Sequence, residues 1–525
     1  MLGIFIGGSS EMITGEVLVI DLFAGPGGLG EGISSVVDES GNYPFKIGVS
    51  VEKEPSAHNT LTTRAFYRKI KAIDGGLDSY FRYVRGELTR DELFCLYPEH
   101  AQEASNETLE GPKALGEDNA LIHDRIRQLL TTHHGPKVVI GGPPCQAYSL
   151  AGRSRNAGNK DYKAEEDHRN FLYKEYLKVL SIAQPDVFVM ENVRGILSAQ
   201  INGKVMFPQI LEDLRNPGKV TGVHGVSKYK IFSLVVEAEE PKNPEYVDSS
   251  DFLIRSECYG VPQARHRVIL LGVRQDITRI PDVISPMAKT VTVEQVLSDL
   301  PPLRSGFSKQ KDIQEDWEKQ VRVNAKKLKC ILKTRFDREA VDNLNLEPML
   351  GLKRHSSQLE KVRHNIPQHL EKWYLDNHPG CVLNHATRGH MTSDLLRYAF
   401  SAAFTMLSGG ISPKARDFPA ELAPEHENWD SGSHADRFRT QAANKCATTV
   451  TSHISKDGHY FIHYDPQQCR SLTVREAARL QTFPDNYLFE GNRTQQYVQV
   501  GNAVPPYLAH QIGKVVLGIL DVDQI

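Results

Sequence analysis

The chain has 525 residues, of which 24% are charged, and a formal net charge of −3. This length suffices for two or more domains with substantial cores. The balanced charge excludes binding of a polyanion through overall positive charge, so such binding would need a local basic face. No apolar run approaches the roughly 18 residues of a membrane span. The seven cysteines show no Cys-x-x-Cys zinc spacing, and their odd number favours a reduced, cytoplasmic protein over a disulfide framework.

Four β-rich segments in the first 200 residues each end in a polar or glycine-rich element. They span residues 17–22, 46–51, 138–140 and 186–190. Helical patterns separate them, for example at residues 125–130 and 172–177. This alternation predicts βαβ units and a mostly parallel sheet, the α/β fold class. The loops after the four strands should then converge at one edge of the sheet, where open α/β sheets place their chemistry.

The first of these strands runs into a glycine-rich loop at residues 23–30. Gly25, Gly27 and Gly28 let the backbone turn tightly and approach a ligand closely. Glu52 ends the next strand, where an acid hydrogen-bonds a ribose hydroxyl in such sheets. The dinucleotide fingerprint and the phosphate-loop motif are both absent. The loop and the acid together favour an adenosine-type cofactor without a polyphosphate over a plain strand-to-helix connection.

A cysteine follows the third strand. Residues 141–146 read GGPPCQ and come directly after the apolar run 138–140. Because proline cannot extend a sheet ladder, the strand should stop there and deliver Cys145 at its carboxyl end. Taken alone, this pattern fits a reactive thiol on a functional loop and a buried apolar thiol equally well.

Six segments resemble the motifs of the 5-cytosine DNA methyltransferases, in the order that this family shows. They are residues 21–28 (DLFAGPGG), 142–146 (GPPCQ), 191–193 (ENV), 260–267 (GVPQARHR), 472–485 (LTVREAARLQTFPD) and 499–505 (QVGNAVP). The match extends from residue 21 to about residue 506, and residues 275–445 carry no recognised motif. The resemblance favours a bacterial or phage-type modification methylase. It implies a Rossmann-like methyltransferase body with a smaller target-recognition domain.

The resemblance also implies a cofactor, S-adenosylmethionine, and no metal. Its binding residues would be Phe23, Gly25, Gly27, Gly28, Glu52 and Asn502. The family uses a further acid to hold the adenine amino group, for which Asp118 is the nearest but poorly matching candidate.

Four residues acquire catalytic roles through the same resemblance. Cys145 would add to carbon 6 of a cytosine flipped out of the duplex, which is covalent catalysis. Glu191 would hold the ring nitrogen at position 3, although an acid favoured by a helix N-terminus is the alternative. Arg265 and Arg267 would contact the base and the active site from one face of a strand, with ordinary salt bridging as the alternative.

The expected partner is double-stranded DNA, which two segments could serve. Residues 147–168 are polar and glycine-containing, as expected of a closing lid or of an ordinary surface loop. Residues 321–335 carry six cations and no acid, which fits DNA contact or one solvated helix. Residues 448–459 suggest a hairpin near the DNA backbone. The three tryptophans could stack on bases or pack in a core.

The predicted division is a catalytic domain at 1–275, a target-recognition domain at 276–490 and a return to the catalytic domain at 491–525. The prolines after residue 280 mark the first boundary. We expect a monomer, with a partner restriction endonuclease in the host and no membrane.

Two other functions are weighed. A tRNA cytosine methyltransferase would share the motifs, but its Cys-Phe-Thr tripeptide is missing. A catalytically silent relative would have lost the cysteine, the glutamate or the cofactor loop, and this chain keeps all three.

Overall fold

The computed structural model describes residues 15–144, 172–201, 203–357, 366–424, 429 and 435–520. Its largest sheet has seven strands in the order β2-β1-β3-β4-β10-β7, and β8 pairs with β10. The strands are β1 (Val17–Leu22), β2 (Phe45–Val51), β3 (Lys137–Gly141), β4 (Val187–Val193), β7 (Tyr229–Phe232), β8 (Leu253–Arg255) and β10 (His266–Arg274). The first four are parallel, whereas β10 runs antiparallel to β4, β7 and β8. The α/β fold with a mostly parallel sheet is therefore confirmed, and the four predicted strands are its parallel part.

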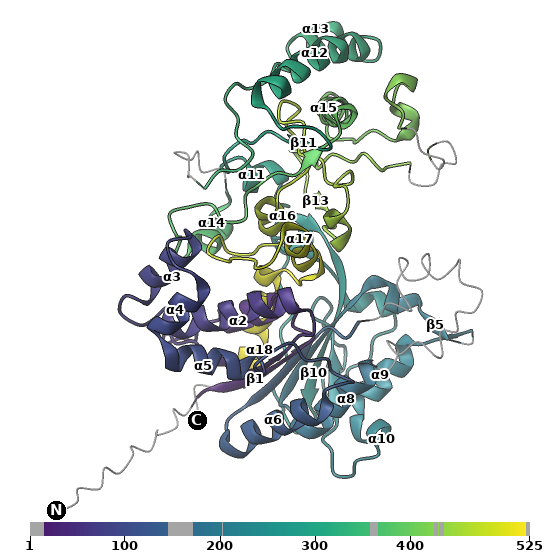
Figure 1. Ribbon diagram of the computed structural model, residues 1–525. Coiled ribbons are helices and arrows are strands. Elements are labelled where there is room, and N and C mark those ends of the chain that lie inside the picture. Colours follow the sequence, from purple (N-terminus) through teal and green to yellow (C-terminus); the bar gives the residue numbers. More distant parts are fainter. Residues whose placement is uncertain are drawn as a thin grey trace, which may run out of the picture.

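Helices cover both faces of this sheet, which explains why its strands are nearly all apolar. Val138 and Ile140 of β3 pack in a layer with α1 (Gly28–Ser34) and α18 (Pro506–Leu520). Val139 of the same strand faces the opposite layer. That layer includes α6 (Asn119–Thr132) and α8 (Leu172–Ala183). Figure 1 shows the C-terminal helix α18 beside β1, so the last part of the chain completes the body that the first part begins.

The polar insertion between β2 and β3 is helical. It contains α2 (Pro55–Ile70), α3 (Gly76–Val84), α4 (Arg90–Leu96) and α5 (Pro98–Glu107). Phe66, Tyr80, Leu93 and Ala104 belong to a small apolar core of its own. Helices α9 (Phe207–Arg215) and α10 (Pro217–Thr221) lie away from this insertion, toward the β7 edge of the sheet (Figure 1).

The region after β10 forms a separate layer above the sheet (Figure 1). Its long helices α12 (Gln314–Lys333) and α15 (Thr392–Leu407) share one apolar core with the fully buried Trp317. Shorter elements complete the region. These are α11 (Val293–Leu297), β11 (Gly306–Phe307), α13 (Arg338–Asp342), α14 (Gln368–Leu375) and β12 (Gly389–His390). Residues 321–335 are thus mostly one helix, whose Lys327 pairs with Glu421 at 3.0 Å.

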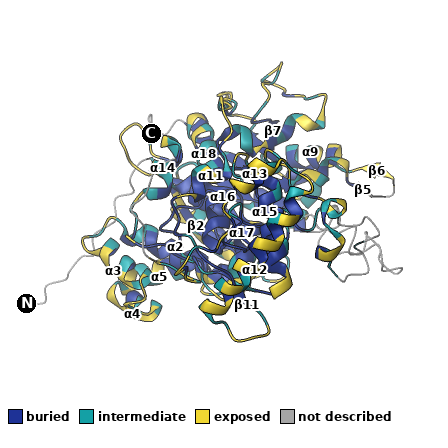
Figure 2. Ribbon diagram, turned by 90° about the horizontal axis from the view of Figure 1, so that it is seen from above, coloured by how far each residue is buried: buried dark blue, intermediate teal, exposed yellow. Residues whose placement is uncertain are grey.

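Helices α16 (Val474–Leu480) and α17 (Arg493–Asn502) lie between this layer and the sheet (Figure 1). Arg475 and Arg479 of α16 are fully buried and donate to backbone carbonyls, and Arg479 also pairs with Asp299 and Asp485. The buried centre in Figure 2 includes α16, and the second half of α17 is mostly buried as well. The late motif at 472–485 therefore has a structural role at the junction between this layer and the sheet.

The expected hairpin at residues 448–459 is wrong. Ala447–Thr448 forms β13, which pairs in parallel with β9 (Gln263–Ala264), and Ser452–Ser455 is a 3-10 turn, η7. Tertiary pairing with a distant strand thus replaces the local turn. Within the described ranges, no helix combines the length and apolar character required to cross a bilayer.

Candidate active site

The carboxyl ends of β3 and β4 come together at the site. Asn192 Nδ2 donates to Pro143 O at 3.1 Å, which ties the end of β4 to the Pro-Pro turn that follows β3. Glu191 Oε2 lies directly over Gly142, because a Cβ at residue 142 would be only 2.8 Å from that oxygen. Only glycine leaves room for the carboxylate there. The sequence motifs GPPC and ENV therefore meet in space, as the parallel topology predicts.

The Glu191 carboxylate is held by an arginine from the neighbouring strand. Arg267 Nε lies 2.8 Å from Glu191 Oε1, and the side chains of both residues are about seven-eighths buried. The pairing follows from the register of β4 and β10. Arg267 lies opposite Val193, which is two residues from Glu191 and therefore on the same face of β4. The salt bridge named as the alternative for Arg267 is therefore formed, with Glu191 as its partner. The arginine fixes one carboxylate oxygen and leaves the other directed toward the Gly142 turn.

Arg265 has different surroundings from Arg267. It lies between β9 and β10, is 2% exposed, and donates to Val450 O at 2.7 Å and to Gly501 O at 3.2 Å. Burial lowers the pKa of Arg265 well below its ordinary value, Arg267 adds to this shift, and Glu191 opposes it. Arg265 therefore joins the sheet edge to the end of α17. The expectation that one strand presents both arginines on one face is not met, because Arg265 falls in the break between two strands.

Cys145 and the whole of the expected lid at 147–168 lie outside the described residues. Pro144, the residue before Cys145, is the last described position after β3. The other described cysteines can be compared as nucleophiles. Burial raises the pKa of four of these thiols, which makes a reactive thiolate unfavourable. They are Cys258, Cys381, Cys446 and Cys469.

The glycine-rich loop after β1 has the strained backbone that its sequence predicts. Phe23, Gly25 and Gly27 all have positive φ, at 55°, 57° and 94°. A Cβ at Gly25 would meet no atom within 4 Å, so open space borders the loop there. At Gly27 a Cβ would lie 2.9 Å from a Leu61 methyl carbon. Gly25 thus faces the free side of the loop, whereas Gly27 faces the protein.

Glu52 anchors this loop. Its Oε2 accepts a hydrogen bond from Gly25 N at 2.8 Å, and its Oε1 accepts one from Glu54 N at 2.7 Å. Burial raises the pKa of Glu52, while the backbone N–H groups of Glu54 and Gly25 oppose the rise. Each oxygen keeps a second lone pair for a ligand hydroxyl.

The last motif, residues 499–505, packs against the glycine-rich loop. A Cβ at Gly28 would lie 2.3 Å from Val504 O, so residues 499–505 lie against the start of α1. Asn502, the last residue of α17, is exposed in this segment. Asp118 accepts from Ala114 N at 2.7 Å, and Lys113 N donates to Glu52 O at 2.9 Å. The structure therefore brings Asp118 to the neighbourhood of Glu52 despite the weak motif match.

Asp21 is a buried acid to which the sequence analysis gave no role. It is 1% exposed, and among the described residues neither of its carboxylate oxygens has a hydrogen-bond partner. Burial raises its pKa to about 8, Arg68 opposes the shift, and Glu107 and Glu52 add to it. The signal was available, because an aspartate inside an apolar strand before a glycine-rich loop is unusual.

Comparison with known proteins identifies the family. The family model of C-5 cytosine-specific DNA methylases matches residues 116–518, more than three quarters of the chain. The chain belongs to this family. It is accordingly an enzyme of the DNA (cytosine-5-)-methyltransferase class.

Individual relatives agree with this family. The chain is 34% identical to type II methyltransferase M.Bpa9945I of Bacillus paralicheniformis, covering 96% of this chain and 99% of the relative. It is 26% identical to the DNA (cytosine-5-)-methyltransferase M.ApeKI of Aeropyrum pernix, over 73% of this chain and 81% of the relative. A solved E. coli structure described as a prophage-encoded DNA modification methyltransferase shares the fold. It is 19% identical, with a TM-score of 0.52 over 96% of this chain and all of the other.

The pKa of Asp21 predicts how the stability of this methylase depends on pH. Its folded pKa of about 8 exceeds the ordinary value of 3.8, so the folded state retains a proton that the unfolded state loses. The stabilisation that this retained proton gives to the folded state is fully present below about pH 4 and falls as the pH rises toward 8. Asp21→Asn should remove that fall. Urea unfolding of the wild type and of Asp21→Asn between pH 4 and 8 measures the free energy of unfolding. A difference in this free energy that stays constant over the pH range would contradict the prediction.

Proposed function

We propose that this protein transfers a methyl group from S-adenosylmethionine to carbon 5 of a specific cytosine, flipped out of double-stranded DNA, through a covalent adduct with Cys145. The observation that carries this proposal is the position of Glu191. Its carboxylate is fixed by Arg267 and lies over Gly142, three residues before Cys145. A proton-handling group and a nucleophile motif thus share one sheet edge.

The residue types suit the chemistry of cytosine, whose carbon 5 is too weak a nucleophile to react directly. The Cys145 thiolate adds to carbon 6, which makes carbon 5 enamine-like, while Glu191 holds N3 and stabilises its protonation. After carbon 5 has gained its methyl group, it loses its proton to a water molecule, and the proton at N3 returns to Glu191. The bond between carbon 6 and sulfur then breaks, and the thiolate and the aromatic ring are restored. Arg267 keeps the Glu191 carboxylate in place throughout, and the target base must leave the duplex to reach these groups.

The glycine-rich loop fits the proposed cofactor. Open space borders Gly25, Glu52 offers two oriented oxygens that suit ribose hydroxyls, and Asp21 is an unpartnered acid below the loop in the described structure. Phe23, Gly27, Gly28 and Asn502 would complete the binding site. When bound, S-adenosylmethionine supplies an electrophilic methyl group.

Gly25→Ala should weaken S-adenosylmethionine binding by about tenfold or more, equivalent to about 1.4 kcal/mol. The new Cβ would enter the open space at the loop, where the cofactor is proposed to lie. Gly41→Ala is the matched control, because Gly41 also has positive φ and an unobstructed Cβ position but lies before the amino end of β2, whereas the glycine-rich loop follows the carboxyl end of the parallel strand β1. Calorimetric titration measures both affinities. Equal affinities for the two variants would remove the loop from the cofactor site.

Glu52→Gln should weaken the same binding by a smaller factor. Both carboxylate oxygens accept backbone N–H groups, so a glutamine amide must turn its NH₂ toward one of these donors. The variant also loses the charge-assisted bonds. Calorimetric titration gives the affinity, and an unchanged value would show that Glu52 does not contact the cofactor.

Sequencing after bisulfite treatment tests the proposed function. DNA from a host expressing the chain should show methylcytosine at one recurring site, and host tRNA treated in parallel should show no new methylation. Methylation of tRNA alone would favour the tRNA alternative. By analogy with its type II relatives, we also propose that the modification protects host DNA from a partner nuclease.

A further inference from the structure

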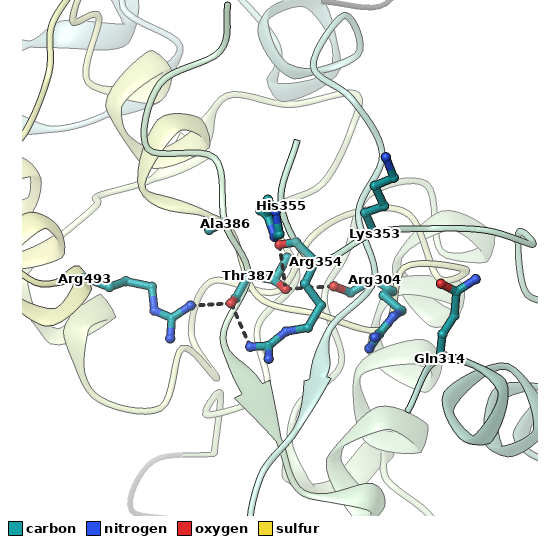
Figure 3. A pocket seen from close by; sticks show the side chains of 8 residues that line it. All are labelled: Arg304, Gln314, Lys353, Arg354, His355, Ala386, Thr387 and Arg493. Carbon is teal, nitrogen blue, oxygen red and sulfur yellow. Dashed lines mark hydrogen bonds between the residues drawn. The ribbon is translucent and has the colours of Figure 1, made fainter. Parts of the chain in front are cut away.

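A strongly basic pocket lies away from the catalytic edge, at the layer that contains α12. Its volume is about 500 Å³. It is lined by Arg304, Gln314, Lys353, Arg354, His355, Ala386, Thr387 and Arg493. Four cations therefore converge from two segments of the central region, at residues 304 and 353–354, and from the first turn of α17 (Figure 3).

The charge of this pocket is only partly neutralised. Asp312 bridges two of the arginines, at 2.8 Å from Arg304 Nη1 and 3.1 Å from Arg354 Nη1. No ion pair is recorded for Lys353 or Arg493 with any acid of the described ranges. The pocket thus carries an excess of positive charge around its opening.

The arginines of the wall also carry donors that no described protein group satisfies. Nε of Arg304 and Nε of Arg354 are buried without a partner among the described residues. Gln314 is the first residue of α12, whose first turn carries Glu315 and Asp316, so the anion site rests on the cations of the pocket and not on this helix N-terminus. In Figure 3, Arg354 and Arg493 both donate to the carbonyl of Thr387, which orients the two guanidinium groups.

The position of the pocket relates it to the active site. Arg493 begins α17, and Gly501 near the end of the same helix accepts from Arg265. A ten-residue helix is about 15 Å long, so the pocket lies on the order of one helix length from the catalytic edge. A duplex with its target base at Glu191 extends well beyond this distance, since one turn of DNA is about 34 Å.

We propose that this pocket binds one backbone phosphate of the DNA substrate, about one helix length from the target base. This inference rests on the proposed function. A phosphate fits better than a base edge, because the forks of Arg304 and Arg354 are already engaged with Asp312 or Thr387. Lys353 adds a point charge, which suits a phosphate oxygen. The contact would set affinity and register without reading sequence.

Charge removal tests the pocket. The double variant Lys353→Gln/Arg493→Gln removes two exposed cations, and Lys219→Gln/Lys242→Gln removes two exposed cations elsewhere. Binding of cognate and non-cognate duplexes is measured against salt. The pocket variant should weaken both duplexes by about tenfold and flatten the salt slope by about one unit, and the control should change neither. A loss confined to the cognate duplex, with the slope unchanged, would indicate base reading and overturn the proposal.

A second measurement uses the wild-type protein, so it does not depend on how the variant folds. Neutral methylphosphonates replace the phosphates of the duplex one at a time. One position near the target should weaken wild-type binding by about the factor that the pocket variant loses, and should have no further effect on that variant. If no position behaves in this way, the phosphate site is wrong. Absence of methyl transfer by wild-type protein that still binds DNA would instead contradict the proposed function.

Discussion

Cys145→Ser should slow methyl transfer to DNA by on the order of 10⁴-fold or more, because a neutral hydroxyl is a far weaker nucleophile than a thiolate. Binding of DNA and of S-adenosylmethionine should survive, since the substitution only replaces one sulfur atom by oxygen. Transfer of an isotopically labelled methyl group to a duplex substrate measures the rate, and filter or fluorescence binding measures the affinity.

Cys95→Ser provides the control for this experiment. Cys95 is an exposed thiol on α4, in the helical insertion between β2 and β3. It should tolerate the same change with full activity. Activity of Cys145→Ser within tenfold of wild type would show that another group performs the addition.

Glu191→Gln should lower kcat by about 10²- to 10³-fold, in the range expected for loss of a proton-handling group. The amide keeps the shape of the side chain but loses the ion pair with Arg267 and the ability to support a proton at N3. The KM for DNA should change much less than kcat, because the carboxylate acts on the reacting ring. Single-turnover methyl transfer under saturating DNA separates these effects.

Gly142→Ala tests the same carboxylate by geometry. Its Cβ would stand 2.8 Å from Glu191 Oε2, so the carboxylate must move although its charge remains. Activity should fall at least tenfold, as expected when a catalytic group is displaced. Gly518→Ala is the control, because a Cβ there meets nothing within 4 Å. Full activity in Gly142→Ala would mean that the position of Glu191 is not critical.

The sheet and its functional edge follow from the sequence because the signals are local. Buried parallel strands read as short β-branched runs, and β1 and β3 do so. Once these strands are parallel, their loops must converge, which places Glu191 beside the GGPP turn. The glycine at residue 142 is explained by a contact that the sequence does not show, because a Cβ at this position would displace the Glu191 carboxylate of another strand.

Long-range contacts could not be predicted in the same way. Arg265 and Arg267 look equivalent in the sequence, yet one contacts carbonyls of residues 450 and 501 and the other contacts Glu191. The basic pocket is assembled from segments up to about 190 positions apart, which the sequence does not show to be neighbours. The domain boundaries at residues 275 and 490 stay predictions.

Covalent trapping tests the central claim most directly. Wild-type protein is incubated with S-adenosylmethionine and a duplex that carries 5-fluorocytosine at the target, where the fluorine prevents release of the adduct. Mass spectrometry of the digested complex should find the modified base, with its added methyl group, attached to the peptide that contains Cys145. Absence of an adduct, or attachment to any other residue, would contradict the mechanism.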